Sequence, residues 1–361
     1  MNRQPFETMP DVMDAKQIAE ALQISKAGAY NLLNDPDFPT LRIGGRKLVM
    51  KADLMDWLKG QTNHKRKKED LNMFMEIFKK IMEERKGDPI PYIPVPDETN
   101  KVMQKYLREF MLVGGMPAVI NKFLETNNYN EVHDEQQKIL NDYLNDIAKY
   151  ASTADKPKAR NCYLSIPRQL AKENTKFKFG EVEKGGTARK YANCLDWLRD
   201  ANLIRYCYNC VPPEFPLAAY VRQEQFRIYT NDIGLLICMY GFEMKQAILT
   251  DSLKGSAKGG IYENLIADFL VKKGYPLYYF KRDDSSSEVE FLIEKECSVV
   301  PIEVKSKKGS TSSLDTILKK DDVKLGYKII DGNLGITEKK KTIPVAYFEK
   351  EGYNIKHKIN P

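Results

Sequence analysis

The sequence predicts a multidomain α+β protein. Its 361 residues exceed what one hydrophobic core usually serves, so two or three domains are expected. Charged and proline-rich sequence over residues 59–97 separates a helical N-terminal part from the rest. Residues 261–353 begin with a helical pattern and continue as strands of alternating polarity. We therefore expect four segments, at residues 1–60, 61–97, 98–240 and 241–361.

The composition indicates a chain without membrane segments whose charge is only mildly basic. The formal net charge is +7, from 57 Lys and Arg against 50 Asp and Glu, which suits nucleic acid only where the basic residues cluster. Six cysteines are spread along the chain, and no stretch has the roughly 18 consecutive apolar residues of a membrane span. We expect a soluble cytoplasmic protein with reduced thiols and no membrane partner.

Residues 14–33 carry the pattern of two short helices joined by a tight turn. Asp14 and Gln17 have the spacing of a capping box, and Ser25 stands at the N-cap position of the second helix. The apolar spacing predicts a buried stripe that includes Ala15, Ile18, Ala29 and Leu33. The same spacing leaves Lys26, Tyr30 and Asn31 on the outer face of the second helix.

A basic hairpin follows these helices. Gly44-Gly45 is a two-residue turn of the kind that closes hairpins, and it is flanked by Arg42, Arg46 and Lys47. Two helices followed by a basic wing form a DNA-docking arrangement, in which the second helix enters the major groove and the wing contacts phosphate. This predicts DNA contacts for Lys26, Tyr30 and Asn31 on the helix and for the three wing cations.

The order of these elements resembles a known family. Residues 18–25 read IAEALQIS, residues 42–46 read RIGGR, and Leu54, Trp57 and Leu58 stand on the closing helix. Residues 12–60 resemble the small winged helix-turn-helix of the excisionase and MerR-like group. The resemblance implies binding to double-stranded DNA.

A second set of motifs lies in the remainder of the chain. The segments are YLREFMLVGGMP at 106–117, YLNDI at 143–147, FRIYTNDIGLL at 226–236 and GIYEN at 260–264. Residues 98–348 resemble the C-terminal region that follows the ATPase module in a group of bacterial and archaeal AAA+ ATPases. Those relatives carry a winged helix and then an α/β restriction-endonuclease-like domain. The resemblance implies a helical and winged-helix region here, with a main helix near Thr187 that leaves Arg189 and Lys190 outside for DNA.

Nucleotide hydrolysis is not expected. The chain contains no Gly-x-x-x-x-Gly-Lys-Ser/Thr loop, whose backbone amides would cradle phosphates. The DNA-binding unit stands where the relatives have their ATPase module.

Two C-terminal strands carry alternating charges. Glu288 and Glu290 are two residues apart, as are Glu303 and Lys305, so each pair is expected to share a strand face while Val289 and Phe291 enter the core. Two carboxylates and a lysine are the groups with which some nucleases hold Mg²⁺ and orient a water. The resemblance assigns catalysis to Glu263, Glu290, Glu303 and Lys305, and Mg²⁺ to Glu290 and Glu303.

One departure separates this chain from the active relatives. Glu290 stands where they have Asp, and the longer side chain displaces its oxygens by more than the roughly 0.5 Å that catalytic groups tolerate. We therefore expect a DNA-binding protein whose nuclease-like domain is non-catalytic or weakly active, with no certain cofactor and Mg²⁺ as the candidate. The alternative is a Mg²⁺-dependent DNA endonuclease, and a plain solvated strand face is also compatible with the pattern.

The remaining chemistry-bearing residues predict no further site. Cys207-x-x-Cys210, with Cys162 and Cys194 upstream, has irregular zinc-site spacing, so buried thiols are expected. The histidines at 64, 133 and 357 predict no Cys-His or Ser-His-Asp system. A second copy of the chain and a separate protein partner both remain open.

Overall fold

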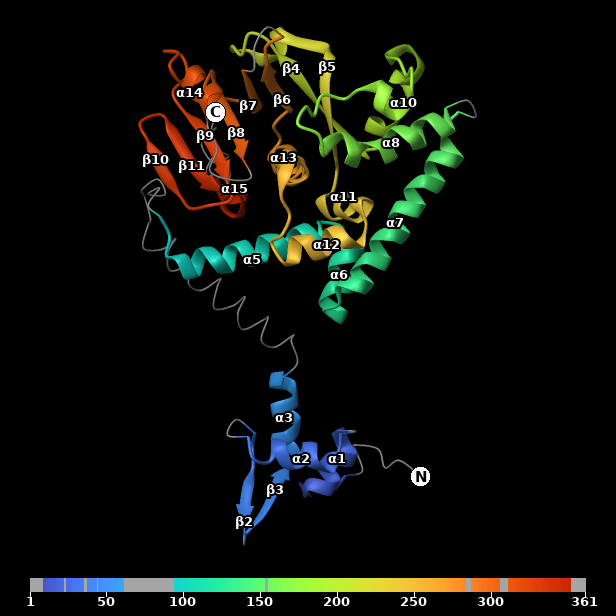
Figure 1. The fold of residues 1–361 in the computed structure, drawn as a ribbon, viewed down its shortest axis with the longest axis vertical. Helices are drawn as coiled ribbons and strands as arrows, with labels where there is room; N and C mark the ends of the chain where they lie inside the picture. Colours follow the sequence, from blue (N-terminus) through green and yellow to red (C-terminus); the bar gives the residue numbers. More distant parts are fainter. Residues whose placement is uncertain are drawn as a thin grey trace, which may run out of the picture. The chain divides into compact units, whose positions relative to one another are not determined.

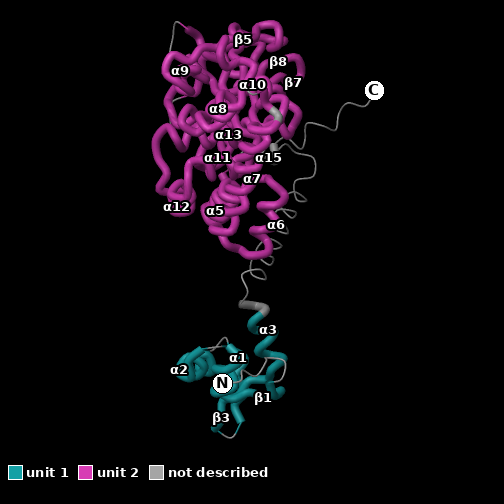
Figure 2. The backbone as a smooth tube through the Cα atoms, turned by 90° about the vertical axis from the view of Figure 1, so that its right-hand side faces the viewer, with its two compact units in different colours: residues 1–90 teal, residues 91–361 magenta. Residues whose placement is uncertain are grey.

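The computed structural model describes residues 9–22, 24–35, 38–43, 45–61, 94–152, 155–283, 287–305 and 311–351. The chain forms two compact units, residues 1–90 (unit 1) and residues 91–361 (unit 2), and each is described by itself (Figure 2). The predicted linker over 61–97 lies mostly outside the described residues. No helix within the described ranges is both long and apolar enough to cross a membrane.

Unit 1 packs three helices against a small sheet. Its elements are β1 (Val12–Met13), α1 (Ala15–Leu22), α2 (Lys26–Leu32), β2 (Leu41–Ile43), β3 (Arg46–Met50) and α3 (Lys51–Gln61). The strands pair antiparallel in the order β1-β3-β2, so β2 and β3 form the expected hairpin. Side chains from the sheet and the helices are completely buried against one another, among them Met13, Ile18, Leu33, Val49 and Leu54.

Local capping explains where α1 and α2 begin. Asp14 Oδ1 accepts hydrogen bonds from the backbone N–H groups of Lys16 and Gln17 at 2.9 and 3.0 Å. The Gln17 side chain accepts in return from the Asp14 backbone N–H at 2.9 Å. Ser25 Oγ accepts from the Gly28 N–H at 3.0 Å. Both predicted caps are therefore confirmed, and they satisfy amides that have no partner inside the helix.

Unit 2 is a larger α/β assembly in which α13 lies near the centre (Figure 1). Its helices are α5 (Asp97–Val113), α6 (Pro117–Thr126), α7 (Tyr129–Tyr150), α8 (Lys156–Leu170), α9 (Phe179–Val182), α10 (Ala188–Asp200), α11 (Ile233–Tyr240), α12 (Phe242–Leu249), α13 (Gly255–Lys272), α14 (Ser312–Leu318) and α15 (Val345–Glu351). Its strands are β4 (Ile204–Cys210), β5 (Val221–Thr230), β6 (Tyr278–Lys281), β7 (Glu288–Lys295), β8 (Ser298–Lys305), β9 (Gly326–Ile330), β10 (Gly335–Thr337) and β11 (Lys340–Pro344).

One sheet of eight strands runs through unit 2 in the order β10-β11-β9-β8-β7-β6-β4-β5. After α13, strands β6, β7 and β8 pair antiparallel, and β9 then pairs parallel to β8 after the crossover through α14. The main core, which includes Leu265, Phe291 and Ile302, lies on the α13 side. A second core packs Leu314 and Ile317 of α14 against the sheet. The sheet is therefore covered by helices on both faces.

The sheet crosses the predicted domain boundary at residue 240. Strand β4 pairs with β5 on one side and with β6 on the other, so strands from before and after this position share hydrogen bonds. Residues 91–361 also cluster as one compact unit. The division into 98–240 and 241–361 is thus not a division between compact units, because a pairing between strands far apart in sequence leaves no local signal.

An irregularity in β7 changes which side chains share a face. The pairing of β6 with β7 shifts register between Tyr278 and Phe280, so three residues of β7 span two of β6. A bulge of this kind breaks the strict alternation of side chains. Val289 consequently lies in the second core and Phe291 in the main core, although the sequence pattern predicts both on one face. Ile302 and Val304 on β8, where the alternation is regular, do share the main core.

Two of the sequence motifs meet at the start of α11. Asp232 is the N-cap of α11 and accepts from the Leu235 N–H at 2.8 Å. Its other carboxylate oxygen accepts from the Gly115 N–H at 2.6 Å. Gly114 has φ +77°, and a Cβ there would lie 2.4 Å from an Asp232 oxygen. Glycine at 114 is therefore required both by the backbone conformation and by the close approach of Asp232.

Candidate functional site

The outer face of α2 presents the three side chains that the sequence assigns to DNA. Lys26, Tyr30 and Asn31 are exposed, and the relative exposure of Tyr30 is 49%. Ala29 and Leu33 are completely buried, so they hold the helix against the core with this face outward. Contact between this face and base edges stays a prediction.

The wing distributes its cations over both faces of the β2–β3 hairpin. Arg42 lies opposite Lys47, and Ile43 lies opposite Arg46. Partners directly opposite share a face and successive residues alternate, so Arg42 and Lys47 lie on one face and Arg46 on the other. Lys47 Nζ also donates to Asn34 Oδ1, directly after α2. The three wing cations therefore do not form one phosphate-facing set, and Lys47 ties the wing to the helix end.

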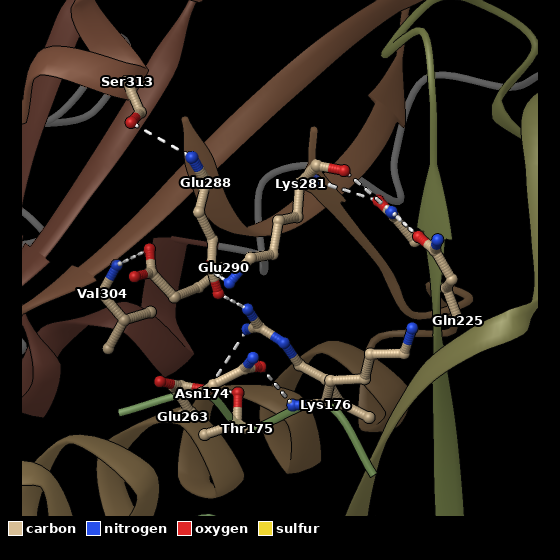
Figure 3. A network of polar contacts seen from close by, with 12 residues as sticks. Asn174, Thr175, Lys176, Gln225, Glu263, Lys281, Glu288, Glu290, Val304 and Ser313 are labelled. Carbon is tan, nitrogen blue, oxygen red and sulfur yellow. Dashed lines mark hydrogen bonds and ion pairs between the residues drawn. The ribbon is translucent and has the colours of Figure 1, made fainter. Parts of the chain in front are cut away.

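In unit 2, Lys305 joins two of the predicted carboxylates. Its Nζ lies 3.0 Å from Glu290 Oε1 and 2.7 Å from Glu303 Oε1. Glu290 Oε2 accepts a hydrogen bond from the Val304 backbone N–H at 3.1 Å (Figure 3). Strands β7 and β8 thus bring Glu290, Glu303 and Lys305 into direct contact, and we call these three residues the carboxylate centre.

Burial controls the protonation of the carboxylate centre. The Glu303 side chain is 3% exposed, and burial together with the neighbouring Glu290 charge raises its pKa to about 7. Burial disfavours the charged form of Lys305, but Glu290 and Glu303 outweigh this effect and raise the pKa of Lys305. Near neutral pH, Glu303 is therefore partly protonated while Lys305 remains a cation.

The fourth predicted residue, Glu263, is bound to a different cation. Arg227 on β5 has a side chain that is 1% exposed, and its guanidinium lies 3.3 Å from Glu263 Oε2 on α13. The same guanidinium also pairs with Glu288 on β7 and lies 4.3 Å from the centre of the Tyr279 ring. Glu263 accepts a further hydrogen bond from the Tyr229 hydroxyl at 3.1 Å. Burial raises the pKa of Glu263, and the charge of Arg227 opposes that rise.

Sequence reasoning missed the role of Arg227. The sequence feature that could have revealed this role is an arginine within the largely apolar strand segment at 226–230. A charged side chain on a buried strand needs a partner. The two partners, Glu263 and Glu288, lie 36 and 61 residues further along the chain. Nothing in the local pattern indicates that these three residues meet.

The carboxylate centre fits a divalent cation only in part. Glu303 Oε2 is buried and has no hydrogen-bond partner among the described atoms, which would suit a cation. Mg²⁺ often uses only one or two protein carboxylates and completes its shell with water, so Glu290 and Glu303 suffice as ligands. Within the described ranges, however, no three His, Cys, Asp or Glu side chains are grouped so that they could hold a metal ion.

The cations predicted on the main helix of the middle region are exposed. Thr187 is the N-cap of α10, and Tyr191 and Leu195 are buried at helical spacing. Arg189 and Lys190 lie outside. Lys190 Nζ is 2.6 Å from Glu183 Oε2, so part of its charge is already compensated. DNA contact by these two residues stays a prediction.

The cysteines are mostly buried, and one of them contacts a histidine. Cys207 lies in the main core and Cys210 in the second core, so these two thiols belong to different cores. Cys238 Sγ lies 3.4 Å from His133 Nδ1, a Cys-His contact that the sequence analysis did not predict. Burial raises the pKa of the Cys238 thiol, which is the opposite of what activates a nucleophile. His64 and His357 lie outside the described residues.

Comparison with protein families gives three matches. Residues 12–62 match a helix-turn-helix domain. Residues 104–246 match a domain of unknown function (DUF8612), and residues 258–348 match another (DUF4143). The helix-turn-helix match supports a DNA-binding role for unit 1, and DUF4143 is typical of proteins associated with AAA ATPases. Comparison with curated proteins and with solved structures gave no match.

Proposed function

We propose that the protein binds double-stranded DNA through unit 1, with α2 in the major groove and the wing against the phosphates. The observation that carries this proposal is the helix-turn-helix match together with the exposed polar face of α2. In this arrangement Asn31 reads a base edge, because an Asn side chain can pair with adenine in the major groove. The wing arginine on the docked face, either Arg42 or Arg46, supplies sequence-independent attraction to phosphate.

Unit 2 has, in this proposal, the winged-helix and restriction-endonuclease-like folds that the family resemblance implies. The order α13-β6-β7-β8-α14-β9, with three antiparallel strands followed by a parallel one, supports the second assignment. The order α8, α9, α10 and then the β4–β5 hairpin supports the first. The match to DUF4143 is compatible with an origin among AAA-associated proteins.

The carboxylates of unit 2 have, in this proposal, a structural role, and little or no cleavage is expected. Arg227 neutralises Glu263 and Glu288, and Lys305 neutralises Glu290 and Glu303. Each of these acids thus already has an internal cation, with which a catalytic metal would have to compete. The longer Glu290 side chain, where active relatives have Asp, weakens the case for turnover further.

A Mg²⁺-dependent endonuclease is the second candidate, and the unpartnered Glu303 Oε2 favours it. Glu290 and Glu303 would hold the ion, and the ion would lower the pKa of a water molecule bound to it. Lys305, which contacts both acids, would orient the water or stabilise charge on the phosphate.

Two assays on the full chain separate the candidates. Selection from random duplexes should recover a preferred sequence if unit 1 reads bases. The recovered duplex is then incubated with Mg²⁺, with Mn²⁺ and with a chelator. We expect binding in all three conditions and little or no cleavage. Efficient metal-dependent cutting that is lost in Glu303→Gln would establish the endonuclease instead.

A further inference from the structure

A second set of cations lies beside the Arg227 network. Lys176 forms an isolated antiparallel bridge with Arg227, and Phe177 donates its backbone N–H to Phe226 O at 2.9 Å. The segment around Lys176 therefore extends the sheet beyond β5. Partners directly opposite in such a pair have Cβ atoms about 5 Å apart, and like charges in these positions destabilise the pair.

Lys281 brings a further positive charge to the same place. Its Nζ lies 2.5 Å from Glu288 Oε2, the carboxylate that also binds Arg227 (Figure 3). Burial lowers the pKa of Lys281, and the charges of Arg227, Lys176 and Lys178 lower it further. Four cations thus lie close together, and the carboxylates of Glu263 and Glu288 pair directly with only two of them, Arg227 and Lys281.

Two of these cations have no direct ion-pair partner among the described residues, and the carboxylates of Asp283 and Glu181 act on them only at longer range. Among the described residues, the side chains of Lys176 and Lys178 make no hydrogen bond or ion pair, and Lys178 is exposed. Lys178 has extended backbone angles, with φ −121° and ψ 118°. In an extended segment, residues two apart lie on one side and about 7 Å apart, so these lysines form a short row. A row of lysines suits a repeating anion better than a single small one.

We propose that Lys176, Lys178 and Lys281 form a second DNA-binding surface, which contacts the phosphodiester backbone of double-stranded DNA. The inference rests on the proposed DNA-binding function, since unit 1 would deliver the duplex. Lys176 and Lys178 make the phosphate contacts, and Lys281, already paired with Glu288, adds to the local field. The surface holds DNA without reading its sequence, because phosphate contacts carry no base information.

The test measures binding of the full chain to a random-sequence duplex by fluorescence anisotropy at several salt concentrations. The background variant carries Lys26→Ala, Asn31→Ala, Arg42→Ala and Arg46→Ala, which remove the proposed unit 1 contacts from the helix and from both faces of the wing. To this background are added either Lys176→Ala with Lys178→Ala, or the matched pair Lys105→Ala with Lys138→Ala from the exposed faces of α5 and α7. Both pairs remove two positive charges, and thermal melting checks that every variant is folded.

We expect the background variant to retain salt-dependent binding. Affinity falls as salt rises, and each phosphate contact adds about 0.9 to the steepness of that fall on logarithmic axes. The Lys176 and Lys178 changes should therefore make the fall shallower by about two units. The Lys105 and Lys138 changes should leave the slope unaltered. Equal slopes for both pairs, or no residual binding by the background variant, would contradict DNA binding by the Lys176–Lys178 surface. The proposed DNA binding by unit 1 would then still stand. If the background variant binds fully and loses binding when Lys176 and Lys178 are changed, the result would support the second surface. It would contradict the proposed DNA binding by unit 1.

Discussion

The guanidinium of Arg227 lies 3.3 Å from the carboxylate of Glu263, and the arginine side chain is 1% exposed. The pair joins β5, which precedes residue 240, to α13, which follows it. Taking both charges out of water is costly, so the contact is maintained only if the geometry and the extra hydrogen bonds compensate. Glu288, Tyr229 and the Tyr279 ring supply those additional contacts.

Removing Arg227 should therefore destabilise unit 2 strongly. Arg227→Met leaves Glu263 without its cation, whereas Glu288 keeps Lys281, and breaking a buried pair typically costs about 3–5 kcal/mol. Arg222→Met is the matched control on the same strand, because its ion pair with Asp283 is largely exposed and worth under about 1 kcal/mol. Urea unfolding measures both. Similar losses for the two variants would mean that the buried network is not what stabilises this region.

Stability should depend on pH through Glu303. Its pKa is raised from an ordinary value of 4.5 to about 7, so between these limits the folded state binds more protons than the unfolded state. The contribution of Glu303 to the free energy of unfolding therefore falls as pH rises from about 4.5 to about 7. Glu303→Gln cannot ionise, so its stability relative to the parent should increase over that window. A constant difference between the two proteins across the window would contradict a raised pKa.

The two wing arginines should behave differently in DNA binding. Arg42 and Arg46 lie on opposite faces of the β2–β3 hairpin, so a duplex docked against one face leaves the other arginine in solvent. One of the variants Arg42→Ala and Arg46→Ala should make the fall of log affinity with log salt shallower by about one unit. The other variant should leave this salt dependence nearly unchanged. Equal effects would show that the hairpin inserts with both faces against phosphate.

Asn31 should contribute specificity more than affinity. It is exposed on α2, where its side chain can pair with an adenine edge. Asn31→Ala should relax the preference at one base pair by about 1–3 kcal/mol, measured by competition between the selected duplex and its single-base variants. An equal loss of affinity for selected and random duplexes would assign Asn31 to phosphate instead.

Divalent metal should raise the melting temperature of the full chain only slightly. A ligand that binds the folded state alone stabilises it, but here Lys305 competes with the ion for Glu290 and Glu303. Any increase with Mg²⁺ or Mn²⁺ should disappear in Glu303→Gln and grow in Glu290→Asp. A large increase that survives Glu303→Gln would place the metal elsewhere in the molecule.

The sequence predicts those features that depend on neighbours along the chain. The capping box of Asp14 and Gln17 follows from their spacing, and the contact of Glu303 with Lys305 follows from their alternation on one strand. The helix that begins after Thr187 follows from its apolar period.

Features that depend on distant pairings could not be predicted in the same way. Arg227 meets partners far along the chain, and Cys238 reaches His133 across 105 positions. The register shift opposite Tyr278 and Phe280 separates Val289 from Phe291, although a strict alternation would keep them together. The sequence of strand β4 also gives no local indication that its second edge pairs with β6.

That last pairing has a consequence for how this protein can be taken apart or recombined. A gene fragment that starts at residue 241 would encode β6 with the edge that β4 normally covers left open. An open edge offers unpaired amide and carbonyl groups to any passing strand, which favours aggregation. Residues 91–361, which form one compact unit, should therefore be kept together by protein engineers, and splicing at 240 should yield insoluble material.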